Sequence, residues 1–133
     1  MSSAIGSLGQ PHTKTVTCLE DISSTYIVSG SGDGKLMVWD VRKLNAPFAS
    51  PSIDGHPIIN LRVSQDRSLA AVSTLKGVYC MSTADMQPVP SDPIVKKPCP
   101  DIVWNKSVQS SSSPQFYASS VTGSVLAFQA SVQ

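Results

Sequence analysis

The sequence predicts an all-β fold. The stretch 29–40 is typical of a strand, a tight turn at Asp33-Gly34 and a second strand that ends at Trp39. A similar pattern returns 42 residues later and again 47 residues after that, with Met81 and then Phe128 in the place of Trp39. No segment sustains the apolar period of 3.6 residues that marks a helix. We therefore expect about three similar antiparallel sheets in a chain of 133 residues, which is long enough to bury a core.

The first sheet has its predicted strands at 16–22, from Ile27 onward, and at 36–39. Residues 36–39 are apolar without interruption instead of alternating, which is typical of a strand covered on both faces. Such a strand needs a neighbouring layer on each side. The pattern therefore indicates sheets that are packed against one another.

The second and third sheets begin with predicted strands at 58–63 and 101–105, both rich in the branched residues that strands favour. The hairpins that follow them cover 69–81 and 116–128. Small residues occupy matching positions in the second strand of every sheet and would let neighbouring sheets approach closely: Ser29-Gly30, Ala71 and Ala118-Ser119.

The segments between these sheets are rich in Pro, Asp and Ser, and we expect 44–54 and 86–99 each to hold an outer strand plus loops. Proline lacks the N–H that a ladder needs, so the Pro-dense stretch 88–100 supports only a short edge strand. The serine run 107–113 is predicted to form a mobile hairpin tip.

The stretch 29–40, with its closing Trp39-Asp40 pair, resembles the core of a WD40 repeat, and 11–19 resembles the start of the same repeat. Pro11 stands where that family more often has Gly. The resemblance implies about three four-stranded antiparallel blades that form a single partial β-propeller domain over residues 1–133. Its repeats would cover approximately 3–43, 44–84 and 85–130.

A buried hydrogen-bonded chain of four side chains is the structural signature that the WD40 resemblance implies. In this sequence His12, Ser29, Asp33 and Trp39 stand at the matching positions. The Asp33 carboxylate would accept from the imidazole, which reaches the Ser29 hydroxyl, and the hydroxyl meets the Trp39 indole N–H. One hydrogen bond to a charged group contributes about 1.5–3 kcal/mol. We expect this tetrad to stabilise the first sheet.

The other two repeats lack a complete tetrad. The second has His56 after Gly55, but Ala71, Leu75 and Met81 replace the partners of that histidine, and the third repeat has no histidine at this position. We therefore expect these two sheets to rely on packing alone.

Two catalytic interpretations of the same residues are less favoured. Ser29, His12 and Asp33 could form a catalytic triad, which needs an exposed nucleophile and an oxyanion hole. The glycines around Asp33 suggest a phosphate-binding loop, but Ser29 and Leu36 stand where that loop requires Gly and Ser or Thr. A turn between strands explains the glycines, so the sequence predicts no enzyme and no cofactor.

Cysteine usage indicates neither a metal site nor a disulfide framework. The chain has three cysteines, an odd and widely spaced set. Cys18 and Cys80 fall in apolar strands and are expected to be buried, whereas Cys99, between two prolines, is expected to be exposed. Such cysteine usage indicates a reducing compartment, so the protein is predicted to be intracellular, in the cytoplasm or nucleus.

Charge gives no global attraction to nucleic acid or membranes, because the net charge is +1 and the pI is about 7.7. The N-terminus lacks the features of a secretory signal, and no apolar run could span a membrane. A nucleic-acid-binding module is the least favoured function, since few aromatic residues accompany the scattered basic ones: Lys35, Lys43, Arg62, Arg67, Lys96 and Lys97.

Arg42 completes the sequence Trp39-Asp40-Val41-Arg42, which resembles the WDxR box of WD40 proteins that dock onto the adaptor of cullin-RING ubiquitin ligases. The planar guanidinium suits this role because it can bind a carboxylate in two places. The alternative is that Arg42 and Lys43 are solvated charges after a strand.

The predicted function is a non-enzymatic protein–protein interaction scaffold, as a C-terminal part or short isoform of a larger propeller protein. The alternative is a ubiquitin-ligase substrate receptor that docks through Arg42. Closed propellers have four to eight blades, more than this chain holds. A homodimer could close a six-bladed ring, with residues 3–8 as the strand that joins two copies, or a second polypeptide could supply the remaining blades.

Overall fold

The computed structural model describes residues 11–43, 47, 49–88, 93–105 and 115–129. These residues form three antiparallel sheets and no helix. Sheet 1 contains β1 (Val16–Asp21), β2 (Tyr26–Ser31) and β3 (Leu36–Asp40). Sheet 2 contains β4 (Ile58–Val63), β5 (Leu69–Thr74), β6 (Val78–Ser82) and β7 (Gln87–Pro88). Sheet 3 contains β8 (Ile102–Trp104), β9 (Gln115–Ser119) and β10 (Val125–Gln129). The all-β prediction is confirmed.

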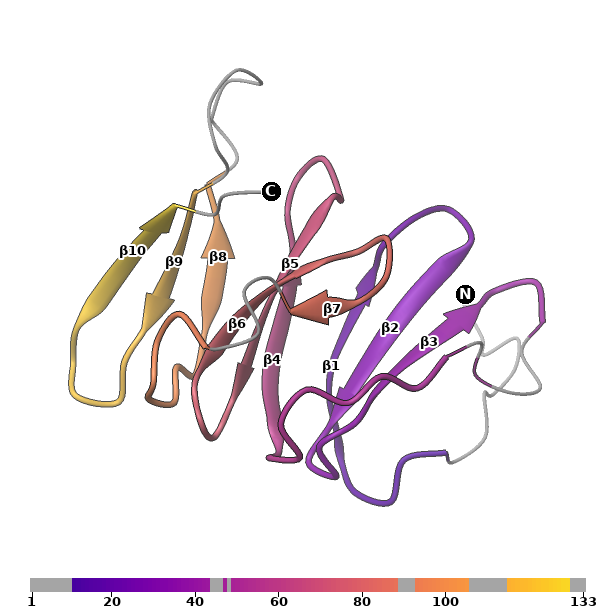
Figure 1. The fold of residues 1–133 in the computed structure, drawn as a ribbon, viewed down its shortest axis with the longest axis horizontal. Coiled ribbons are helices and arrows are strands. Elements are labelled where there is room, and N and C mark those ends of the chain that lie inside the picture. The colour runs from indigo at the N-terminus through magenta and orange to yellow at the C-terminus, as the bar shows by residue number, and fades with distance from the viewer. Residues whose placement is uncertain (1–10, 44–46, 48, 89–92, 106–114, 130–133) are drawn as a thin grey trace, which may run out of the picture.

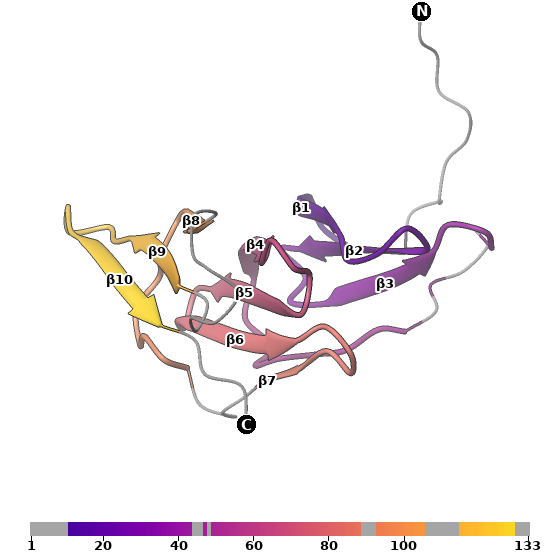
Figure 2. The same ribbon diagram turned by 90° about the horizontal axis from the view of Figure 1, so that it is seen from above.

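The three sheets stand side by side in a curved row, with sheet 2 in the middle (Figures 1 and 2). Each is a meander in chain order, and the first strands β1, β4 and β8 are neighbours along one side of the row. Side-chain hydrogen bonds join β4 to β1 and to β8. Thr17 Oγ1 donates to the Ile58 carbonyl at 2.8 Å, and Trp104 Nε1 donates to the Arg62 carbonyl at 2.8 Å.

Two apolar layers form the core, one between each pair of neighbouring sheets. The layer between sheets 1 and 2 holds Cys18, Val28, Leu36, Val38, Ile58, Leu61, Val72, Met81 and Met86. The layer between sheets 2 and 3 holds Leu69, Ala71, Val78, Cys80, Val95, Cys99, Ile102, Trp104, Phe116 and Ala118. Every residue of β3 and β5 is buried, as the unbroken apolar run 36–39 predicted for β3.

Glycines permit the closest approaches in this packing. A Cβ added to Gly30 would lie 2.6 Å from Cys18 Sγ and 2.9 Å from Ile58 Cγ2. Sheet 2 would then have to move away from sheet 1. A Cβ added to Gly77 would collide with the carbonyl oxygen of Val95, a residue that pairs with β6. Both positions therefore require the absence of a side chain.

Sheet 2 has the four strands predicted, whereas sheets 1 and 3 have three strands each among the described residues. Beside β3, Ala49 exchanges two backbone hydrogen bonds with Val38, and the carbonyl of Pro51 accepts from Leu36. These contacts are isolated bridges because Pro51 has no N–H with which to continue a ladder. In sheet 2, β7 is an edge strand of two residues that ends at Pro88.

The strand limits differ slightly from the prediction at the ends, since β1 stops at Asp21 and β8 covers only Ile102–Trp104. β7 lies in the interval 85–130 but pairs with β6 of the interval 44–84. The predicted joining strand at 3–8 and the predicted hairpin tip at 107–113 lie outside the described residues.

All three cysteines are buried and free. For Cys18 and Cys80 this was predicted, whereas the expected exposure of Cys99 is wrong, because its side chain lies in the layer between sheets 2 and 3. Ser73 Oγ donates to the Cys99 carbonyl and holds this proline-flanked segment against β5. Burial raises the pKa of all three thiols, so none is activated as a thiolate.

Candidate functional site

The structure brings His12, Ser29, Asp33 and Trp39 into one hydrogen-bonded chain. Trp39 Nε1 donates to Ser29 Oγ at 3.0 Å, and Ser29 Oγ lies 2.7 Å from His12 Nε2. His12 Nδ1 lies 3.1 Å from Asp33 Oδ2. Because an indole only donates and a carboxylate only accepts, a neutral imidazole satisfies every member when Ser29 donates to Nε2 and Nδ1–H donates to Asp33.

Asp33 is the last acceptor in this series of hydrogen bonds, and its side chain is only 5% exposed. The backbone N–H of Thr13 donates to Oδ2 at 2.9 Å, and the backbone N–H of Lys35 donates to Oδ1 at 3.0 Å. Burial acts to raise the pKa of Asp33, but the N–H groups of Lys35 and Thr13 and the His12 imidazole together lower it. The carboxylate therefore ties the segment before β1 to the turn between β2 and β3.

The connectivity of Ser29, His12 and Asp33 is that of a catalytic triad, but the geometry does not present a nucleophile. Ser29 is 4% exposed, and its Oγ accepts the Trp39 indole N–H. A triad serine must reach a substrate carbonyl beside an oxyanion hole. The arrangement is therefore suited to holding sheet 1 together and not to acyl transfer.

Sheet 2 has a polar network of its own, which contradicts the expectation that it relies on packing alone. Asp54 Oδ2 accepts from Thr74 Oγ1 at 2.8 Å and from Tyr79 OH at 2.9 Å, and Oδ1 accepts from the His56 backbone at 2.9 Å. Burial acts to raise the pKa of Asp54, but these three donors lower it. The local sequence signal was Asp54 two residues before His56, the spacing of an Asx turn.

The register of sheet 2 also corrects the predicted equivalences. Leu19 of β1 faces Ser29, and the corresponding Leu61 of β4 faces Val72, so Val72 and not Ala71 takes the place of Ser29. In sheet 3 a serine again organises the turn. Ser120 Oγ lies 2.9 Å from Thr122 Oγ1 and accepts from the backbone N–H groups of Thr122 and Ser124, so sheet 3 is not held by packing alone either.

Acid should destabilise the protein through these two buried aspartates. Their pKa values are lowered in the folded chain, so their contribution to stability is present above about pH 4 and is lost as the pH falls through the folded values. We expect the midpoint of urea unfolding to fall steadily between pH 5 and pH 2. The Asp54→Asn variant should show a shallower fall, and an unchanged midpoint down to pH 3 in the unmodified chain would contradict the assignment.

Arg42 lies directly after β3, and Asp40 holds its guanidinium. Arg42 Nε donates to Asp40 Oδ1 at 3.0 Å, and Nη2 donates to Oδ2 at 2.9 Å. This pair lowers the pKa of Asp40 to about 2 and raises that of Arg42. The Arg42 side chain stays 67% exposed, but Asp40 occupies the Nε–Nη2 edge of its guanidinium. Docking to a ligase adaptor through Arg42 stays a prediction.

Two further arginines from the scattered basic set also pair with carboxylates. Arg62 reaches Glu20 at 3.3 Å, and Arg67 reaches Asp21 at 2.6 Å, so both ion pairs link sheet 2 to sheet 1. Their exposed positions make each pair worth little in isolation. Arg62 and Arg67 thus lie beside acidic residues of β1.

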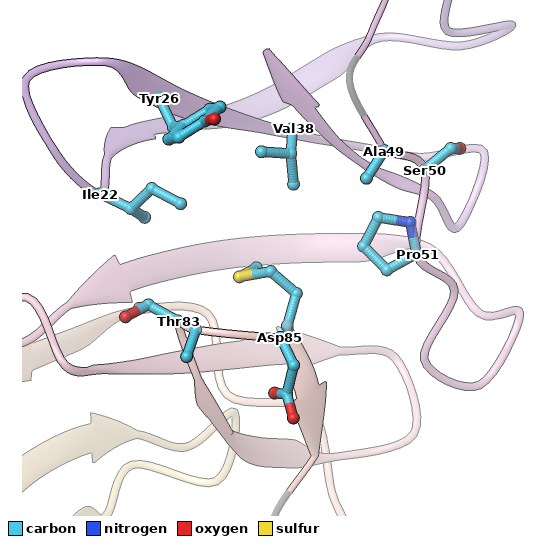
Figure 3. A pocket seen from close by; sticks show the side chains of 10 residues that line it. Ile22, Tyr26, Val38, Ala49, Ser50, Pro51, Thr83 and Asp85 are labelled. Carbon is cyan, nitrogen blue, oxygen red and sulfur yellow. The ribbon is translucent and has the colours of Figure 1, made fainter. Parts of the chain in front are cut away.

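A groove of about 630 Å³ lies between sheets 1 and 2 (Figure 3). Val38 and Met86 line it as buried residues, and Ile22 and Tyr26 are half-buried on the sheet 1 side. The turn from Thr83 to Met86 forms the opposite side, and the segment 49–51 forms one end. The sequence did not reveal this groove, because its two sides lie far apart along the chain.

The described residues contain no group of three or more His, Cys, Asp or Glu side chains placed to hold a metal ion. Within the same residues there is also no helix of the length and apolarity that crossing a membrane requires.

Antiparallel sheets packed face to face in a curved row, with the first strand of each sheet innermost, define the blades of a β-propeller. The structure is similar to that of the C-terminal WD40 domain of Sif2, with a TM-score of 0.69 and 19% sequence identity. The similarity covers 91% of this chain and 35% of that chain, so this chain spans about a third of the Sif2 domain structure. The resemblance to WD40 blades is thereby confirmed at the level of the fold. No protein-family description and no curated protein matches the sequence.

Proposed function

We propose that this chain is a non-enzymatic protein-interaction scaffold that forms part of a WD40-type propeller assembly. The observation that carries the proposal is the groove between sheets 1 and 2, which combines an apolar floor with polar groups at its rim. Pockets of this kind accept a partner's apolar side chain, while the rim fixes its orientation. The WD40-type fold supports a scaffold in general, and fold alone does not name the partner.

The segment that closes one end of the groove offers a way to hold an extended peptide. Ala49 and Pro51 direct their carbonyl groups toward β3, so the intervening Ser50 directs its peptide groups away from β3. A partner strand could pair with Ser50 and place alternate side chains over the floor at Val38 and Met86, as in β-strand addition. The proposed ligand is therefore an extended, partly apolar peptide segment of another protein.

The test begins with affinity purification on the full chain, followed by direct binding measurements with the purified partner. We expect a stoichiometric partner whose affinity falls about tenfold or more in the Ala49→Glu variant, because a charge then stands at the end of the groove. The matched control is Leu75→Glu, an exposed position outside the groove that should bind as the unmodified chain does. Equal losses in both variants, or no directly binding partner, would contradict the proposal.

A further inference from the structure

Sheet 3 lies at one end of the row (Figures 1 and 2), and it carries the exposed apolar residues Val103 and Val125. Phe116, Ala118, Leu126 and Phe128 pack against sheet 2, so the residues that alternate with them point the opposite way. We define the outer face of sheet 3 by these residues, which are in register across its three strands: Val103, Tyr117, Val125 and Ala127. A shallow hollow of about 150 Å³ lies among them.

The same positions are buried in the other two sheets. In register, the places of Tyr117, Val125 and Ala127 are taken by Val28, Leu36 and Val38 in sheet 1 and by Ala71, Val78 and Cys80 in sheet 2. Leu36 and Val78 are 0% exposed because the next sheet covers them, whereas Val125 is 78% exposed. The outer face of sheet 3 is therefore the continuation of an interface that the molecule already makes twice.

Sheet 1, at the other end of the row, has buried residues on the outer side of β3. On the corresponding outer side of sheet 1, Met37 and Trp39 are buried, and the His12 side chain is 3% exposed. Val16 and Leu19 are the large apolar residues of β1 that remain exposed there, at 46% and 62%. A ring of two copies would need this face of sheet 1 to receive sheet 3. Because Met37 and Trp39 of β3 are already buried, contact through sheet 3 is favoured over such a ring.

The four residues that define the outer face of sheet 3 carry no charge. Val103 stands where sheets 1 and 2 carry Glu20 and Arg62, and the flanking residues of β9 and β10 are neutral: Gln115, Ser119 and Gln129. The exposed Asp101 also lines the hollow on this face, and its carboxylate accepts from Asn60 of sheet 2 at 3.0 Å and from the Ile102 backbone at 2.9 Å. Two such faces can be placed together because their central residues carry no charge and the carboxylate at their edge already has donors.

We propose that two copies of this chain associate through the outer face of sheet 3, face to face about a two-fold axis. An interface of this kind is self-complementary and closes at two copies, whereas contact between unlike ends forms a ring if the rotation closes and a filament if it does not. The proposal concerns the chain alone and does not depend on the groove or on any other partner.

Sedimentation of the purified full chain tests this. We expect a dimer at micromolar concentration, and we expect Val125→Glu to raise the dissociation constant at least about 30-fold, because each interface would then bury two unpaired carboxylates. The matched control is Val121→Glu in the β9–β10 turn, which is 65% exposed but lies off this face and should leave the dimer intact. Circular dichroism checks that both variants fold. A monomer at micromolar concentration, or equal dissociation of the Val125→Glu and Val121→Glu variants, would overturn the proposal.

Cross-linking distinguishes the face-to-face arrangement from a ring. Tyr117 lies on the central strand β9, so its two copies should lie near the two-fold axis. We expect Tyr117→Cys to form a covalent dimer with a short bismaleimide, while the native cysteines, all buried, react little. In a mixture of Leu19→Cys and Val125→Cys chains no cross-link should join the two different variants, and efficient cross-linking of Leu19→Cys to Val125→Cys would overturn the face-to-face arrangement.

Discussion

Replacing Phe116 by alanine should lower the free energy of unfolding by about 3–5 kcal/mol, the range for large aromatic side chains removed from cores. Phe116 is 0% exposed and is the central ring of a row of three. Its centroid lies 5.0 Å from that of Trp104 and 5.2 Å from that of Phe128. These three rings form much of the surface that sheet 3 turns toward sheet 2, so the cavity would open between the two sheets and not inside one of them.

Urea unfolding of the Phe116→Ala chain measures this loss. The matched variant Phe116→Leu keeps most of the apolar volume and should lose clearly less than the alanine variant. The fluorescence of Trp104 reports whether sheet 3 separates before the rest, since Trp104 packs beside Phe116. A loss below about 1 kcal/mol for alanine would mean that sheet 3 does not depend on this contact with sheet 2.

The sequence predicted the parts of the structure that depend on short-range patterns. The turn at Asp33-Gly34 and the strands on either side follow from residues that are close in the chain, so the position of Ser29 opposite the Trp39 strand could be predicted. The hydrogen bonds of Asp54 were missed because Thr74 and Tyr79, its side-chain donors, lie 20 and 25 residues away. Only the register of β5 and β6 places them at one carboxylate.

Which face of sheet 3 is buried could not be predicted from the sequence either. Ile102 and Val103 are similar side chains at adjacent positions, yet one is 2% exposed and the other 55%. Alternation predicts that they face opposite sides, but it does not predict which side another sheet covers. The burial of Cys99 likewise depends on a loop that folds back onto β5, which its neighbouring prolines did not indicate.

The second large effect is expected at Asp33. Its replacement by alanine removes the acceptor for the His12 imidazole and for the backbone N–H groups of Thr13 and Lys35. Hydrogen bonds to a charged acceptor contribute about 1.5–3 kcal/mol each, and donors that lose a buried partner are costly. Since Thr13 and Lys35 regain water in part, we expect a total loss of about 3 kcal/mol in the free energy of unfolding.

A double-mutant cycle separates the stability that the His12–Asp33 hydrogen bond contributes from the effect of simply removing the Asp33 charge. Asp33→Ala and His12→Ala should each destabilise the protein, and together they should cost less than the sum, with a coupling of about 1–2 kcal/mol. Asp66→Ala is the control, because Asp66 caps an exposed turn through Ser64 and Ser68 and has no link to His12. Additive effects of Asp33 and His12 would mean that the imidazole and the carboxylate stabilise sheet 1 independently. A coupling would mean that the segment before β1 is attached to the turn between β2 and β3 through the His12 imidazole.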